Sequence, residues 1–183
     1  MKQLRRDITM KSNWKYQPSD LPAGWKYFTL DELIHSDTAD RLGINNTPTS
    51  EAVSNINDLV TNVLDRLRGE WGRPIIVTSG YRCKELNAAV GGTHNSQHLK
   101  GQAADIVSRD VKSPEGTLLT PDQKAPTGRP ISDDFEAFRR FVLRWCRDNE
   151  FDQCIFEHSS DSEWIHISYV EGGNRRQMLY LNV

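Results

Sequence analysis

The clearest pattern along the chain is a run of apolar residues at helical spacing between residues 48 and 71. These positions are Val53, Ile56, Leu59, Val60, Val63, Leu64, Leu67 and Trp71. Steps of three and four residues place them on one face of an α-helix. Thr47 is the expected N-cap, with Pro48 at the first helical position. The pattern predicts an amphipathic helix that packs in the core.

A second helical pattern lies at residues 132–149, which read SDDFEAFRRFVLRWCRDN. Ser132 is suited to cap its N-terminus. One face carries Phe135, Phe138, Val142 and Trp145. This segment is therefore predicted to be another amphipathic helix.

Two shorter segments also predict helices. Residues 29–36, TLDELIHS, place Thr29 three positions before Glu32, the spacing of a capping box. Residues 84–90, KELNAAV, are long enough for one or two turns, and the glycine pair that follows is expected to end them.

Five segments have the composition of β-strands. Residues 75–78 are expected to form a buried strand that ends at a glycine turn, and residues 103–108 a second strand. Residues 153–158, 163–170 and 176–182 predict three more, the last two joined as a hairpin through EGGN. The predicted helices come mostly early in the chain and the antiparallel strands late. This order indicates the α+β class, with helices packed on a small, mostly antiparallel central sheet.

Two segments fall outside this pattern. Residues 1–26 are polar, carry Pro18 and Pro22, and are expected to form an irregular N-terminal arm before a domain at 27–183. Residues 109–131 hold four prolines and two glycines and predict a long excursion. This excursion is either a surface insertion without a role or a wall of the functional site.

Composition excludes several classes of function. The chain has 183 residues, enough for one domain with a real core, which we expect to be a monomer. A formal net charge of −2 argues against nucleic acid as a partner. No apolar run approaches the ~20 residues that span a bilayer, so membrane insertion is not expected. The N-terminus has no apolar segment typical of a secretory signal, so synthesis in the cytoplasm is expected. Three cysteines without a CxxC motif argue against a disulfide framework or a cysteine zinc site.

Candidate chemistry begins at residues 96–107, SQHLKGQAADIV. His98 is expected in a loop, and Asp105 at the start of the next strand. A catalytic zinc site needs three protein ligands and an open fourth position. His166 is the candidate third ligand, because it lies inside an amphipathic strand pattern. The spacing of His98 and Asp105 alone is weak evidence for a metal site, because a loop histidine followed by a strand-capping aspartate has the same spacing.

Three motifs together resemble a known family. SGYRC, SQHLKGQAADI and EWIHISY occur in the order and spacing of the zinc-dependent M15 peptidases, the group of D-Ala-D-Ala carboxypeptidases and phage endolysins. The resemblance runs from about residue 28 to about residue 180. It implies His98, Asp105 and His166 as ligands of one Zn²⁺ per chain.

The resemblance also implies a catalytic carboxylate. In related members it lies three residues before the last histidine, where this chain has Glu163. Three residues along a regular strand would place Glu163 opposite His166, so we expect it in the loop before regular pleating begins. Glu157, on the neighbouring strand, is the rival. Arg82 is expected to face substrate and hold its charge, and Ser96 to orient substrate.

The implied function is that of a zinc metallopeptidase that hydrolyses a peptide bond in bacterial peptidoglycan stem or cross-bridge peptides, as an endolysin does. It would act on the wall after release from the cell, or as part of a virion. One alternative is a D,D-carboxypeptidase or dipeptidase acting on small D-Ala-D-Ala substrates. Another is a zinc-holding binding module without turnover.

Overall fold

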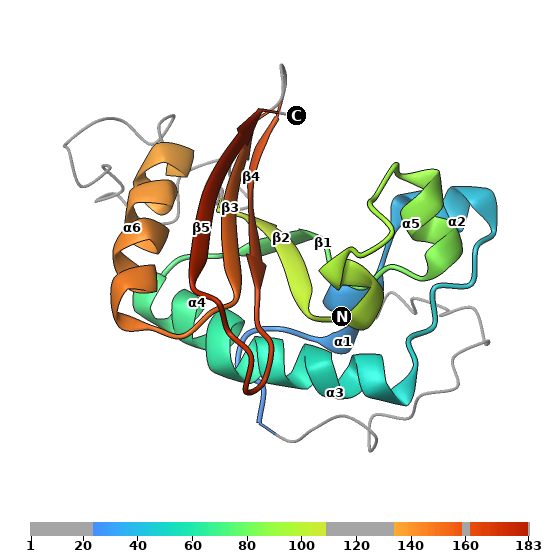
Figure 1. Cartoon of the computed structure of the whole chain (residues 1–183), viewed down its shortest axis with the longest axis horizontal. Helices are drawn as coiled ribbons and strands as arrows, with labels where there is room; N and C mark the ends of the chain where they lie inside the picture. Colours follow the sequence, from blue (N-terminus) through green and yellow to red (C-terminus); the bar gives the residue numbers. More distant parts are fainter. Residues whose placement is uncertain (1–23, 109–133, 159–161, 183) are drawn as a thin grey trace, which may run out of the picture.

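The computed structural model describes residues 24–108, 134–158 and 162–182 (Figure 1). Most of the predicted N-terminal arm, the excursion at 109–131 and the predicted cap Ser132 lie outside these residues. The described part contains helices packed on a five-stranded mixed sheet, which confirms the α+β class.

The strands follow the order β1-β2-β4-β3-β5 across the sheet. Their bounds are β1 Ile76–Ser79, β2 Ala103–Val107, β3 Gln153–His158, β4 Glu163–Ser168 and β5 Gln177–Asn182. Each neighbouring pair is antiparallel except β3 and β5, which run parallel. The sheet is therefore mostly antiparallel, as predicted.

The predicted hairpin between the last two strands is wrong. β4 pairs with β2 on one side and with β3 on the other, so neither of its edges is open to β5. β5 instead crosses to the far edge of β3 and pairs with it in parallel, with Ile155 opposite Leu179. The hairpin of this region is formed by β3 and β4.

The long helix is present, with one correction at its start. It comprises α3 (Ser50–Leu59), a π-helical turn (Val60–Leu64) and α4 (Asp65–Trp71) without interruption. Its N-cap is Thr49 and not Thr47, because the Thr49 side chain accepts a hydrogen bond from the Ala52 amide at 3.1 Å. The Thr47 hydroxyl is instead bonded to Asn45.

The remaining helices are α1 (Leu30–Ile34), α2 (Asp37–Leu42), α5 (Lys84–Ala89) and α6 (Asp134–Asp148). The predicted capping box of α1 is present, with reciprocal hydrogen bonds between Thr29 and Glu32. No helix in the described ranges combines the length and apolar character needed to cross a bilayer.

The prediction of a buried first strand is also wrong. β1 begins at Ile76, one residue later than expected, and its residues alternate between exposed and half-buried. It is the terminal strand of the sheet among the described residues, so only Val77 and the preceding Ile75 contribute to the core.

The two faces of β3 and β4 have different neighbours. One face, here called the core face, packs with the long helix and α6 in a single hydrophobic cluster. Its strand residues are Cys154, Phe156, Ile165 and Ile167. Figure 1 shows α6 beside these strands, on the side away from α5 and α2. The opposite face, here called the metal face, carries Ile155, Glu157, Trp164, His166 and Ser168.

Candidate metal centre

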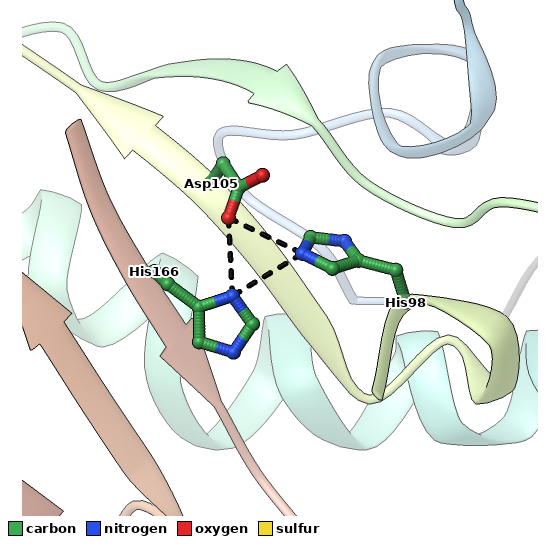
Figure 2. Close-up of side chains that lie close together, drawn as sticks. All are labelled: His98, Asp105 and His166. Carbon is green, nitrogen blue, oxygen red and sulfur yellow. Dashed lines mark hydrogen bonds and ion pairs between the residues drawn. The ribbon is translucent and has the colours of Figure 1, made fainter. Parts of the chain in front are cut away.

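Three side chains from separate elements meet on the metal face. Figure 2 shows His98, Asp105 and His166, here called the ligand triad, pointing toward one another. His98 Nε2 lies 3.2 Å from His166 Nδ1 and 3.2 Å from Asp105 Oδ1. His166 Nδ1 lies 3.1 Å from the same carboxylate oxygen. All three residues are buried, and the structure brings these three predicted ligands together. That they bind a metal ion stays a prediction.

Strand register positions two of the three. Asp105 on β2 lies directly opposite His166 on β4. Directly paired residues of an antiparallel ladder project from the same face with Cβ atoms about 5 Å apart. The sheet therefore fixes the separation of these two side chains before any ion is bound.

The third ligand is held by a short 3₁₀ turn, Gln97–Lys100, between α5 and β2. The Ser96 side chain caps this turn by accepting a hydrogen bond from the His98 amide at 3.3 Å. Gly101 ends the turn with φ +71°, and a Cβ there would lie 2.5 Å from the Ala52 carbonyl oxygen. The turn thus depends on glycine to reach its place against α3.

A backbone carbonyl determines which ring nitrogen of His98 carries the proton. Its Nδ1 lies 2.7 Å from the Gly80 carbonyl oxygen, which can only accept, so Nδ1 carries the proton. Nε2 of the neutral ring then presents a lone pair to the triad. Such a partner on the outer nitrogen is typical of metal-binding histidines. No sequence signal identified Gly80, because the contact is made by its backbone.

Asp105 is ionised in this setting. Its Oδ2 accepts a hydrogen bond from the Arg82 guanidinium at 2.7 Å, and this positive charge favours the ionised carboxylate. A carboxylate oxygen and the lone pair of His98 Nε2 therefore face each other at 3.2 Å. Two such acceptors repel unless a cation or a shared proton lies between them.

The donor set fits zinc. Imidazole nitrogen and carboxylate oxygen are ordinary zinc ligands, with bonds of about 2.0–2.2 Å. Ligand atoms around a tetrahedral ion with such bonds lie about 3.3 Å apart. The three separations here are 3.1, 3.2 and 3.2 Å. Three protein ligands also leave a fourth position for water or substrate, as in catalytic zinc sites.

Arg82 holds the outer oxygen of Asp105. Its Nη2 donates to Asp105 Oδ2 at 2.7 Å, and its Nε donates to Ser79 Oγ at 2.8 Å. The sequence predicted that Arg82 faces substrate, whereas the structure places its guanidinium on a member of the ligand triad. Ser96, predicted to orient substrate, has its hydroxyl on the turn of His98. Their roles toward substrate stay predictions.

Glu157 lies on the metal face. It pairs with Trp164 across the β3–β4 ladder, while His166 pairs with Ile155. Glu157 is thus the diagonal neighbour of His166, at the ~7–8 Å typical of that relation. Burial raises the pKa of Glu157, and the negative charge of Asp105 raises it further.

Glu163 lies on the opposite face. We expected it in a loop before regular pleating, and this expectation is wrong, because the β3–β4 ladder extends to the pair His158–Glu163. The carboxylate of Glu163 lies 3.3 Å from the His158 ring, and both side chains are largely exposed. Regular alternation therefore directs Glu163 away from His166.

A second buried carboxylate, Asp152, was missed in the sequence. It precedes β3 and accepts a hydrogen bond from the Gln97 side chain at 2.8 Å, next to His98 in the chain. Arg175 binds the same carboxylate with its backbone amide and its guanidinium. An aspartate beside a strand in FDQC is a weak signal, since its partners are distant in sequence.

The sequence of this chain is similar to those of known peptidases. Residues 26–128 match the family model described as Peptidase M15. The chain belongs to this family. A 59-residue stretch is 42% identical to a protein of Streptomyces albus G named zinc D-Ala-D-Ala carboxypeptidase. That stretch covers 31% of this chain and 23% of the relative. The family match includes His98 and Asp105, whereas His166 lies beyond it and joins them through the register of β4 with β2.

Proposed function

We propose that this M15 family member is a zinc-dependent peptidase that hydrolyses a peptide bond in bacterial peptidoglycan stem or cross-bridge peptides, with one zinc ion per chain. The observation that carries the proposal is the ligand triad with a carboxylate, Glu157, on the same face of the sheet. A zinc ion held there would supply Lewis-acid polarisation of a carbonyl and acidification of a water molecule.

The remaining chemistry belongs to side chains of this chain. Glu157 accepts a proton from the attacking water and delivers it to the leaving amine. Its raised pKa suits this role, because a proton shuttle works best when its pKa approaches the operating pH. Arg82 fixes the orientation of Asp105, and its guanidinium beside the triad holds negative charge on the substrate.

The substrate class rests on the relative's name and on the space beside the site. A cleft of about 880 Å³ runs beside β1 and reaches Ser79 and Arg82. Arg82 lines this cleft and also binds Asp105, so the Arg82 side chain connects the cleft to the ligand triad.

Digestion of purified cell-wall sacculi, followed by mass analysis of the released ends, tests this function. New amino ends inside stems or cross-bridges support an endolysin-like peptidase that acts on the wall after release or from a virion. Release of terminal D-alanine alone supports the D,D-carboxypeptidase alternative. Zinc-loaded protein that releases nothing is a zinc-holding module, and the proposal is then wrong.

Substitution of the two glutamates separates catalysis from metal holding. Glu157→Gln should lower kcat by ~10²–10⁴-fold with zinc retained, because it removes the proton shuttle. Glu163→Gln is the matched control and should change kcat by less than about threefold, since its side chain lies on the opposite face. The reverse ranking, at equal zinc content, would return the role of base to Glu163.

A further inference from the structure

The metal face continues beyond Glu157 onto β5. The parallel register of β3 and β5 places Leu179 opposite Ile155 and Leu181 opposite Glu157. Two rows of side chains therefore cross the sheet. One runs through His166, Ile155 and Leu179, and the other through Trp164, Glu157 and Leu181. Apolar side chains thus surround the proposed base on the sheet.

These apolar side chains lie outside the main hydrophobic cluster of the protein. Ile155 is 9% exposed, yet it is not part of the hydrophobic cluster that contains its strand neighbours Cys154 and Phe156. Trp164 and Leu179 are half-buried and also lie outside that cluster, and Leu181 is 42% exposed. Within residues 24–108, 134–158 and 162–182, these four side chains therefore do not pack in that cluster.

The other face of β5 behaves differently. Tyr180 stacks on Phe156 with ring centroids 5.1 Å apart, so it extends the core face. Tyr180 is 60% exposed, more than Leu181, although the two are neighbours in the strand. Exposure on β5 is thus not confined to the metal face, and Tyr180 provides a control in the same strand that is more exposed than Leu181.

We propose that Ile155, Trp164, Leu179 and Leu181, here called the apolar shelf, bind an aliphatic side chain of the peptide substrate and so set sequence preference next to the cut. This proposal rests on the proposed function. The shelf is continuous with the proposed base, because Trp164 and Leu181 are its two cross-strand partners. A peptide that extends from Glu157 across β3 and β5 passes over it.

Strand geometry indicates which residue of the substrate contacts the apolar shelf. Neighbouring strands lie about 4.8 Å apart, so β5 lies about 10 Å from β4, which carries His166. An extended peptide advances about 3.3 Å per residue. Leu179 and Leu181 therefore contact the second or third residue from the scissile bond, and Ile155 the residue nearer the cut.

The chemistry of the shelf favours an uncharged aliphatic residue. Its own side chains are apolar, and the charged group beside it is the carboxylate of Glu157. An acidic substrate residue would lose hydration on the shelf and meet a like charge. A small aliphatic residue loses no hydrogen bonds there and buries apolar surface.

The test uses synthetic peptides of the sequence that the wild-type protein cuts in sacculi. Each peptide carries alanine, leucine or glutamate at one of three positions on either side of the cut. Wild-type protein should prefer alanine or leucine over glutamate by about tenfold or more at one position. Leu181→Gln should reduce that preference to below about threefold, through KM and with kcat within about twofold.

Two variants and one measurement control this result. Tyr180→Gln should keep the wild-type preference, and Leu181→Met, which stays apolar, should keep it as well. All variants are compared at equal zinc content and equal unfolding midpoint. An unchanged preference in Leu181→Gln, or an equal change in Tyr180→Gln, would overturn the shelf. So would a wild-type dimer that Leu181→Gln dissociates without changing preference, because the surface would then be a subunit interface. Absence of cleavage by wild-type protein would overturn the proposed function itself.

Discussion

Two buried aspartates, Asp105 and Asp152, are each bound by an arginine, but their remaining partners differ. Both oxygens of Asp152 accept from groups that carry protons: Arg175 N and Nε on Oδ1, and Arg175 Nη2 and Gln97 Nε2 on Oδ2. Asp105 has such a partner on Oδ2, from Arg82. Its Oδ1 faces two imidazole nitrogens instead.

The difference separates a structural carboxylate from a functional one. Asp152 is 1% exposed and satisfied by the protein alone, so it fastens the turn of His98 to the start of β3. Asp105 accepts a hydrogen bond from Arg82 on Oδ2, whereas its Oδ1 faces the His98 Nε2 lone pair, which brings no proton and favours a cation between the two atoms. A buried carboxylate oxygen that faces two imidazole nitrogens is thus a better marker of a metal site than burial or charge alone.

The largest expected effect is loss of zinc in Asp105→Asn. A neutral amide removes the charge that holds the ion, so bound zinc should fall from about one per chain to near zero, and hydrolysis by more than about 10³-fold. Asp152→Asn should keep its zinc, with an affinity within about tenfold of wild type. Metal analysis after dialysis measures both. Loss of zinc in both variants, with folding intact, would contradict the distinction between the two aspartates.

A large effect on stability should appear at the other aspartate. Asp152→Ala leaves Arg175 and Gln97 without their acceptor and should lower the free energy of unfolding by about 2–3 kcal/mol. This is less than the about 3–5 kcal/mol of a fully buried pair, because the Arg175 side chain is 55% exposed. Urea unfolding of zinc-loaded protein provides the measurement.

Glu150→Ala is the control for that experiment. Glu150 pairs with Arg176 at 2.9 Å, and both side chains are exposed. Its removal should cost less than about 1 kcal/mol. Equal losses of unfolding free energy in the two variants would show that Asp152 does not stabilise the fold more than an exposed ion pair does.

The two arginines should differ in a smaller but measurable way. Arg82→Gln frees the outer oxygen of Asp105 and should weaken zinc binding by about 10–100-fold, as loss of a partner behind a ligand typically does. Arg175→Gln should change zinc affinity by less than about threefold. Competition with a chelator of known affinity measures both. A larger effect from Arg175 than from Arg82 would place the support of the site in the Asp152 network.

Sequence periodicity predicted elements better than their pairing. The long helix, α6 and the late strands have strong patterns of period 3.6 or 2, which depend on nearby residues only. The partner of β5 was mispredicted, because pairing depends on which strand edges remain open. The N-cap was mispredicted as Thr47 instead of Thr49, because both threonines precede the helix closely and the sequence alone does not distinguish them.

The candidate site could be predicted in its ligands but not in its surroundings. The triad follows from the resemblance of the motifs. The expectation that Glu163 lies in a loop and turns back toward His166 was wrong, because the strand extends to Glu163. The sequence could not place Glu157, whose position on the metal face depends on the register of β3 with β4. The Gly80 carbonyl and the Asp152 network are contacts between distant segments, for which a single sequence carries no local signal.

The smallest expected effect concerns the pH dependence of stability. Hydrogen bonds from Arg175 hold the pKa of Asp152 below its usual range in the folded protein. An unfolded aspartate titrates near about 3.9. The stabilisation from a lowered pKa is fully present above that value and is lost as the pH falls through the folded-state pKa. The stability difference between wild type and Asp152→Asn should therefore stay constant from pH 7 to about 5 and shrink below about 4. Urea midpoints of metal-free protein measure this stability difference without interference from zinc release. A difference that persists undiminished well below pH 3 would mean that Asp152 does not titrate as a partner of Arg175.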